Sequence, residues 1–298
     1  MSNISSAGHD LVVFMGSPEG KVIQKTSRRD LHDDEVLIQV THSGVCGTDV
    51  HFRDQPIGLG HEGAGIIQAV GRNCQRLKAG DRVGWGYCHN EAYVFRIPDQ
   101  IDLASAAPLM CGGATVFGTF HRLNVKPSDT VGILGLGGLG HLAVQFSKSF
   151  GCNTIALSDT LSKKESILEL GAHQFFSIAD LKNGMKPPKL QHLIVTASVL
   201  PSEWDHLIPL LDTMANIAPL RSAPEILNIP AQAVVFYGFN IVGTIIASRA
   251  VHNQMLEFAA LHGIKPLIEE YPMTVDGIEK ALNALGAGEV RYRAVLKS

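Results

Sequence analysis

Three side chains with the chemistry of zinc ligands lie between residues 46 and 111. Cys46 lies in Ser-Gly-Val-Cys-Gly-Thr, His61 in Gly-Leu-Gly-His-Glu-Gly, and Cys111 in Pro-Leu-Met-Cys-Gly-Gly. Two thiolates and an imidazole are a set that Zn²⁺ prefers, and three protein ligands leave a fourth position open for water or substrate. Their wide spacing is weak support by itself, because a single buried cysteine usually acts as a small apolar core residue.

A glycine-rich segment, Gly-Leu-Gly-Gly-Leu-Gly at residues 135–140, could bind a dinucleotide. The apolar run 131–134 before it predicts a buried strand, and helical apolar spacing follows it. In such a turn Gly135 permits the tight bend, Gly137 lets a pyrophosphate approach the backbone, and Gly140 lets the helix pack closely. The alternative is a strand–helix turn without a ligand, and the second predicted strand at 154–157 favours the dinucleotide.

The elements that position these residues fall into two patterns. Before residue 103, short β-rich runs predict strands at 11–14, 22–24, 35–42, 66–70, 82–84 and 93–97. A helical pattern at 103–123 carries Cys111. Six strands then follow, separated by helical stretches that include 162–170 and 203–211, and they predict a doubly wound parallel sheet. These six strands are expected at 131–134, 154–157, 173–177, 192–196, 215–218 and 240–247.

Composition and cysteine usage point to a soluble cytoplasmic protein. The net charge is −3 and the basic residues are dispersed, which argues against nucleic acid as a partner. The apolar run 11–15 is too short for a signal peptide or a membrane span. Five widely spaced cysteines do not resemble a disulfide framework, so reduced thiols are expected.

Five motifs are recognisable along the chain: residues 46–51 (Cys-Gly-Thr-Asp-Val-His), 60–62 (Gly-His-Glu), 108–111 (Pro-Leu-Met-Cys), 135–141 and 290–293 (Val-Arg-Tyr-Arg). In combination they resemble the zinc-dependent medium-chain alcohol dehydrogenases, in particular the cinnamyl-alcohol-dehydrogenase-like branch. The similarity runs over nearly the whole chain.

The resemblance implies an α/β architecture with two domains. A mostly β, GroES-like catalytic domain would comprise residues 1–114 and 251–298. A Rossmann domain with a doubly wound parallel sheet would comprise 115–250. By analogy with the family, the chain would form a homodimer through its apolar edge strand at 240–247, since an unpaired apolar edge invites pairing.

The resemblance also assigns roles at the metal site. Cys46, His61 and Cys111 would hold one catalytic zinc, and Glu62 could enter the coordination sphere when water leaves. Thr48 would hydrogen-bond the substrate oxygen and His51 would pass its proton towards solvent, a role that suits a group titrating near neutrality. Without the family pattern, Thr48 would be read as a turn hydroxyl and His51 as a surface histidine.

The cofactor preference depends on the end of the second strand of the parallel sheet. An acidic residue there accepts from the ribose of NAD, whereas a small polar residue with nearby cations admits the 2′-phosphate of NADP. Ser158 occupies that position and Lys163 follows, so NADP(H) is favoured over NAD(H), although Asp159 could still face a ribose and the lysine could belong to a solvated helix face. The predicted cofactor-binding residues are Thr115, Gly135, Gly137, Gly138, Leu139, Gly140, Ser158 and Lys163.

The chain departs from the family pattern after Gly80-Asp81-Arg82-Val83. The family normally carries a lobe there in which four closely spaced cysteines hold a structural zinc, but here residues 84–87 lead almost directly into 91–94. Cys88 cannot make that site by itself, so only the catalytic zinc is expected. The segment between His51 and Gly60 is also short.

Three hypotheses for function follow. The first is a zinc-dependent, NADP(H)-linked alcohol dehydrogenase or aldehyde reductase for primary alcohols and aldehydes, aromatic or medium-sized. The second is a metal-independent NADPH reductase of a conjugated alkene or imine, which the retained ligand set argues against. The third is a shortened, catalytically weak NADP-binding protein.

Overall fold

The computed structural model describes residues 8–87, 93–197, 200, 202, 204–220 and 226–298. The chain divides into two compact units, one formed by Met1–Cys111 with Leu256–Ser298 and the other by Gly112–Met255. Cys88, which bears on the predicted loss of a structural zinc site, lies outside the described residues.

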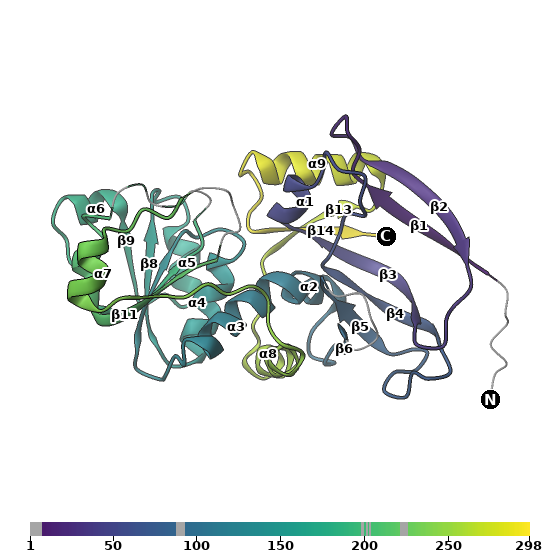
Figure 1. Ribbon diagram of the computed structural model, residues 1–298, viewed down its shortest axis with the longest axis horizontal. Helices are drawn as coiled ribbons and strands as arrows, with labels where there is room; N and C mark the ends of the chain where they lie inside the picture. The colour runs from purple at the N-terminus through teal and green to yellow at the C-terminus, as the bar shows by residue number, and fades with distance from the viewer. Residues whose placement is uncertain (1–7, 88–92, 198–199, 201, 203, 221–225) are drawn as a thin grey trace. The chain divides into compact units, whose positions relative to one another are not determined.

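The first unit is built mainly from β-strands (Figure 1). An antiparallel hairpin joins β1 (His9–Met15) and β2 (Ile23–Arg29). A six-stranded sheet has the order β13-β14-β3-β4-β5-β6, and all neighbours are antiparallel except β13 and β14. Its strands are β13 (Ile268–Pro272), β14 (Arg293–Lys297), β3 (Val36–Val45), β4 (Gly63–Val70), β5 (Arg82–Trp85) and β6 (Val94–Arg96).

Short helices cover this sheet. They are α1 (Gly47–His51), α2 (Leu103–Pro108) and α9 (Val275–Gly286). Helix α9 begins where the Thr274 hydroxyl accepts a hydrogen bond from the Gly277 amide at 3.2 Å. Ile278, Ala281 and Leu282 recur at helical spacing and bury this face of α9 in a core cluster with residues of β3 and β14.

The second unit is a parallel six-stranded sheet with the order β9-β8-β7-β10-β11-β12. Counted along the chain this is 3-2-1-4-5-6, the order of a Rossmann dinucleotide-binding fold. The strands are β7 (Thr130–Leu134), β8 (Asn153–Ser158), β9 (Gln174–Ser177), β10 (Leu190–Val195), β11 (Leu211–Pro219) and β12 (Asn240–Ile241). The predicted α/β class is therefore confirmed.

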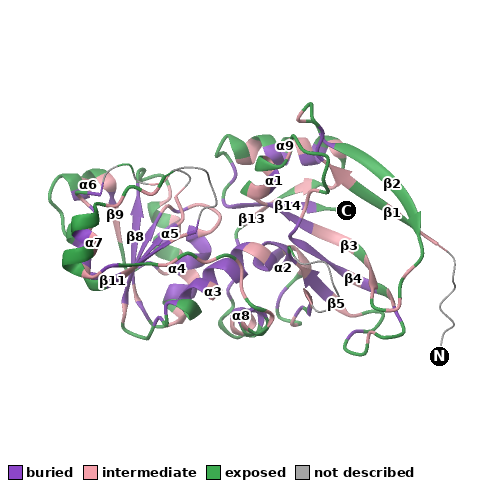
Figure 2. Ribbon diagram, in the orientation of Figure 1, coloured by how far each residue is buried: buried purple, intermediate pink, exposed green. Residues whose placement is uncertain are grey.

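Helices precede, connect and follow these parallel strands. They are α3 (Ala114–Arg122), α4 (Gly140–Ser149), α5 (Lys164–Leu170), α6 (Ile178–Lys182), α7 (Ala231–Tyr237) and α8 (Arg249–His262), whose last turns belong to the first unit. All five residues of β7 are buried, as expected for a strand covered on both faces. Figure 2 shows this burial along the strands of the sheet and on α3 and α4, whereas α7 is largely exposed.

Two sequence predictions were wrong in detail. The helix expected at 203–211 is absent from its described part, 204–211, which forms turns, a 3₁₀ turn at Ile208–Leu210 and the start of β11. Pro209 lies in that turn and cannot donate the hydrogen bond that an α-helix needs. The edge strand expected at 240–247 is limited to β12, and Ile246 further along has a left-handed φ of 53° that an extended strand does not allow.

The predicted helix at 103–123 is present as α2, a π-helical turn at Leu109–Gly113, and α3. This run, Leu103–Arg122, is long and apolar enough to span a membrane, but 78% of its apolar window is buried inside the protein. Burial of that kind is the property of a core helix.

Candidate active site

Strand pairing explains why residues far apart in the sequence meet at one edge of the first unit's sheet. Strand β3 ends at Val45, whose partner in β14 is Ala294, and Ser43 pairs with Gly63 at the start of β4. Because both neighbours run antiparallel to β3, the end of β3 lies beside the starts of β4 and β14. Cys46, His61 and Arg293 flank these three strand ends and therefore converge.

The four predicted metal ligands form one cluster. Ligand atoms of Cys46, His61, Glu62 and Cys111 all lie within 4.8 Å of one another. The π-helical turn that follows Pro108 carries Cys111 to the cluster. Such turns within α-helices are frequent at functional sites because they redirect side chains.

Asp49 organises two of these ligands, a role that the sequence analysis did not assign. Its Oδ2 accepts a hydrogen bond from the Cys46 amide at 2.9 Å, and its Oδ1 accepts one from the Gly60 amide at 2.9 Å. The same Oδ1 lies 3.3 Å from His61 Nδ1. The spacing of Cys46 and Asp49, three residues apart at the start of α1, is that of a capping box and could have indicated this contact.

The orientation of His61 suits a metal ion. Asp49 engages Nδ1, so the other ring nitrogen is available for ligation, as in carboxylate–histidine–zinc arrangements. Among the described residues and their contacts, His61 Nε2 is a buried polar atom with no hydrogen-bond partner. Together with two cysteine sulfurs, this nitrogen makes the donor set fit Zn²⁺.

The protons of this cluster are unevenly distributed. The hydrogen bond with Cys111 holds the pKa of the Cys46 thiol well below its ordinary value. The same contact, together with burial, raises the pKa of Cys111. For His61, burial opposes the charged form, but the adjacent Asp49 and Cys46 side chains outweigh it and raise the pKa to about 11. A metal ion bound here would have to displace the protons of Cys111 and His61, because only deprotonated side chains act as ligands.

Glu62 is held by a buried ion pair with Arg293. Their exposed fractions are 0% and 6%, and an Arg293 nitrogen contacts both carboxylate oxygens. Burial raises the pKa of Glu62 to about 7, although the Arg293 charge opposes that shift. Residue 44 must be glycine here, because a Cβ atom would lie 1.9 Å from Glu62 Oε2.

Three further side chains border the cluster or lie on α1 beside it. The Thr48 hydroxyl oxygen lies 3.8 Å from Cys46 Sγ, within hydrogen-bonding distance for sulfur. His51 ends α1 and is exposed. The ring of Tyr87 is tilted against that of His61, with 4.4 Å between centroids, and Tyr87 is 40% exposed. An aromatic surface therefore adjoins a candidate metal ligand.

In the second unit, the glycine-rich turn has the geometry that the motif requires. Gly135 has a φ of 91°, and a Cβ there would lie 2.4 Å from the backbone of Ala197. A Cβ at Gly140 would lie 2.0 Å from the Gly135 carbonyl oxygen, whereas nothing lies within 4 Å of a Cβ at Gly137. The backbone is thus open at Gly137, next to the amino end of α4, where a phosphate could approach.

The other predicted cofactor-binding residues lie in the same unit. Ser158 ends β8 next to the turn, since the Gly135 amide donates to the Leu157 carbonyl at 3.0 Å. Lys163 directly precedes α5, and Thr115 is buried in α3. Gly138 and Leu139 complete the turn. Their contacts with a cofactor stay predictions.

Comparison with known proteins identifies the family. The Alcohol dehydrogenase GroES-like domain matches residues 32–134. A probable formaldehyde dehydrogenase, AdhA, from Bacillus subtilis is 30% identical, and the alignment covers 96% of this chain and 96% of that protein. The chain belongs to the medium-chain alcohol dehydrogenase family.

Other proteins similar to this alcohol dehydrogenase family member also carry alcohol dehydrogenase names. A probable cinnamyl alcohol dehydrogenase, 8C, of Oryza sativa subsp. japonica is 32% identical over 91% of this chain and 74% of that protein. The crystallised cinnamyl alcohol dehydrogenase SbCAD4 of Sorghum bicolor superposes with a TM-score of 0.88 at 27% identity, covering 97% of this chain and 98% of that one. The GroES-like and Rossmann-like architecture predicted from the sequence is thereby confirmed.

Proposed function

We propose that this protein is a zinc-dependent, NADP(H)-linked alcohol dehydrogenase or aldehyde reductase that transfers hydride between the nicotinamide and a primary alcohol or aldehyde. The observation that carries the proposal is the cluster of Cys46, His61 and Cys111, with the buried Nε2 of His61 available for ligation. The unit containing this cluster would be the catalytic domain, and the unit Gly112–Met255 would bind the dinucleotide.

Cys46, His61 and Cys111 would hold one catalytic zinc, with Glu62 as an additional ligand. Bound zinc would supply Lewis-acid polarisation of the substrate oxygen. Asp49 fixes the His61 ring from behind, and Arg293 holds the Glu62 carboxylate beside the ligands. A structural zinc site is not part of the proposal. We expect none, because Cys88 stands by itself in the segment where the family's lobe has four closely spaced cysteines.

Thr48 and His51 are the residues proposed to transfer the proton. The Thr48 hydroxyl lies beside the Cys46 sulfur and could hydrogen-bond the substrate oxygen. His51 is one helical turn further along α1 and is exposed, so its imidazole can exchange a proton with solvent. The two residues together would carry a proton between the buried oxygen and bulk water.

The dinucleotide would bind at the turn Gly135–Gly140, with its pyrophosphate over the open backbone at Gly137. NADP(H) is favoured because Ser158, rather than a carboxylate, ends β8, with Lys163 nearby in sequence and Thr115 as a further contact. Relatives named NADP-dependent alcohol dehydrogenase C support this preference, including one from Mycobacterium bovis at 30% identity.

Aromatic or medium-sized aldehydes are the proposed substrates. The aromatic ring of Tyr87 against His61 supplies an apolar surface beside the metal ligands. Relatives named cinnamyl alcohol dehydrogenase point to the same substrate class. The proposed location is the cytoplasm, where two cysteines this close together would stay reduced and able to bind metal.

We also propose a homodimer that forms through the open edge of the parallel sheet. Strand β12 is the last strand of the sheet, and exposed apolar side chains lie on α7 before it, on β12 itself and in the segment after it. They are Val235 at 77% exposure, Phe236 at 74%, Ile241 at 47% and Ile245 at 77%. A second copy pairing along this edge would cover them.

A pair of cysteine variants separates the zinc mechanism from a metal-independent reductase. Cys46→Ala should reduce NADPH-dependent aldehyde reduction by at least about a thousandfold, because the site loses a ligand and its charge. Cys74→Ala should retain activity, since Cys74 hydrogen-bonds the backbone carbonyls of Asp33 and Glu35 and is not one of the clustered ligands. Full activity in folded Cys46→Ala would favour the metal-independent alternative. Cofactor binding without turnover in the wild type would favour the catalytically weak protein.

A further inference from the structure

A pocket lies in the unit Gly112–Met255, at the edge of the parallel sheet opposite the glycine-rich turn. Asp129 precedes β7, whereas the turn follows the far end of that strand. The pocket has a volume of about 300 Å³ and lies at the starts of β7, β10 and β11. Nothing in the proposed dehydrogenase mechanism uses it.

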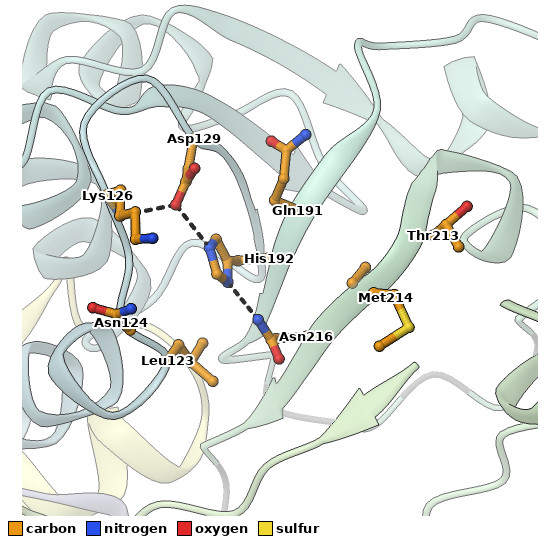
Figure 3. A pocket seen from close by; sticks show the side chains of 10 residues that line it. Leu123, Asn124, Lys126, Asp129, Gln191, His192, Thr213, Met214 and Asn216 are labelled. Carbon is orange, nitrogen blue, oxygen red and sulfur yellow. Dashed lines mark hydrogen bonds and ion pairs between the residues drawn. The ribbon is translucent and has the colours of Figure 1, made fainter. Parts of the chain in front are cut away.

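A buried histidine links two polar groups across this pocket. His192 is 5% exposed, and its Nε2 lies 3.1 Å from Asp129 Oδ2. Its Nδ1 lies 3.1 Å from the Asn216 side-chain nitrogen. Figure 3 shows the three side chains in a continuous hydrogen-bonded row. With both ring nitrogens engaged, His192 fixes Asp129 and Asn216 in place.

The backbone around the pocket is irregular on both sides. Leu190 pairs with Leu211, but His192 pairs with Asn216, so β11 bulges out between those pairs. Met214 in the bulge has a φ of 62°, and Asn124 on the opposite wall has a φ of 51°. They are two of four described non-glycine residues with positive φ. β-Bulges and positive-φ residues are concentrated at functional sites, where the backbone must orient particular side chains.

Hydrogen-bonding capacity remains at this site. The Lys126 amide donates to Asp129 Oδ2 at 2.8 Å, which leaves the second carboxylate oxygen without a partner among the described residues. The same holds, within the described part of the chain, for the Asn216 side-chain oxygen and the Asn124 side-chain amide. Hydrogen-bond acceptors and donors therefore line the same pocket.

The charges in this space cancel. Lys126 and Asp129 contribute opposite unit charges, and no other lysine, arginine, aspartate or glutamate is among the described residues that line the pocket. Because these two charges offset each other, a free anion or cation gains no net Coulombic attraction from the pocket. A hydroxyl group can donate to Asp129 or Asn216 and accept from Lys126 or Asn124. The apolar side chains of Leu123 and Met214 can cover the carbon face of such a ligand.

We propose that this pocket binds a neutral polyhydroxylated ligand of sugar size, either a free monosaccharide or the ribose of a nucleoside. The site is independent of the dehydrogenase centre. The proposal therefore stands whether or not the proposed oxidoreductase activity is found.

Met214, which is 62% exposed and lines the pocket, reports on this site directly. The full-length protein, labelled with ¹³C at its methionine methyl groups and saturated with NADP⁺, would be titrated separately with ribose, glucose and adenosine. The Met214 resonance is assigned with Met214→Leu. The expected result is a saturable shift of that resonance with ribose or glucose, and a stronger response to adenosine than to ribose would identify a nucleoside as the source.

Asn124→Gly is the matched variant, because glycine keeps the left-handed backbone while removing the amide. It should weaken sugar binding roughly two- to tenfold, the effect of one lost hydrogen bond, with the fold unchanged. Lys25→Ala, on an exposed strand of the other unit, should leave binding unaffected. The proposal is overturned if no sugar or nucleoside shifts Met214, if inorganic phosphate or methylammonium shifts it instead, or if folded Asn124→Gly binds as tightly as the wild type.

Discussion

At the residue scale, one carboxylate connects the backbone of the first candidate ligand with the ring of the second. Asp49 bonds the Cys46 amide and lies 3.3 Å from His61 Nδ1. Both partners come from different strand ends, so Asp49 fixes their separation as well as the orientation of the imidazole. Outer-sphere contacts of this kind commonly alter metal affinity by about 10- to 100-fold.

Asp49→Asn should therefore weaken zinc binding by about 10- to 100-fold, because a neutral amide holds the His61 ring less firmly. Competition with a chromogenic chelator measures the affinity, and circular dichroism checks that the variant is folded. Asp54→Asn is the matched control, since Asp54 is exposed and lies five residues further along. Equal zinc affinity in Asp49→Asn and Asp54→Asn would contradict the positioning role.

The sequence predicted the four clustered ligands but not the residues that hold those ligands in position. Cys46, His61, Glu62 and Cys111 stand in motifs with distinctive local patterns, and the structure brings them within 4.8 Å. Arg293 belongs to a motif that carried no role, because its contact with Glu62 exists only after β14 pairs with β3. Contacts made through long-range strand pairing leave no local signal in the chain.

At the scale of secondary-structure elements, the local sequence pattern predicted an element best where all of its residues are buried. Strand β7 is buried throughout and was predicted within one residue of its observed bounds. The prediction failed at 203–211, where apolar residues at helical spacing serve turns and the start of β11 instead. Leu207, Leu210 and Leu211 are buried there in the core of the parallel sheet. Regularly spaced apolar residues indicate that one face of the segment is buried. Such residues can be buried without forming a helix.

Two glycines of the cofactor turn should respond differently to alanine. Gly137→Ala meets no atom within 4 Å, so the free energy of unfolding should stay within about 0.5 kcal/mol of the wild type. The added methyl group would nevertheless occupy the space of the pyrophosphate, and NADPH binding should weaken by about tenfold or more. Urea unfolding and fluorescence titration with NADPH measure the two quantities.

Gly140→Ala is the comparison variant. Its Cβ would lie 2.0 Å from the Gly135 carbonyl oxygen, so α4 must shift and the protein should lose roughly 1–3 kcal/mol of stability. If Gly137→Ala binds NADPH normally while remaining folded, the pyrophosphate does not lie over this turn.

At the scale of the whole molecule, the exposed apolar edge of the parallel sheet requires an explanation. Ile245→Lys places a charge beside β12 and should convert the proposed homodimer to a monomer, because a buried unpaired charge opposes association. Light scattering coupled to size-exclusion chromatography measures the mass of each species. Leu261→Lys is the control, an exposed leucine at 80% on α8, and should leave the dimer intact. A wild-type protein of 32.0 kDa in solution would contradict the dimer.

The proposal for the molecule as a whole is that a catalytic zinc site persists in a chain that lacks the structural zinc lobe. The measurement that tests it most directly is the zinc content per chain of purified protein by elemental analysis, with NADPH oxidation by cinnamaldehyde followed on the same sample. About one zinc per chain with turnover is the predicted result, the count for a single three-ligand catalytic site. Turnover without zinc would contradict the proposed mechanism, and about two zinc ions per chain would contradict the absence of a structural site.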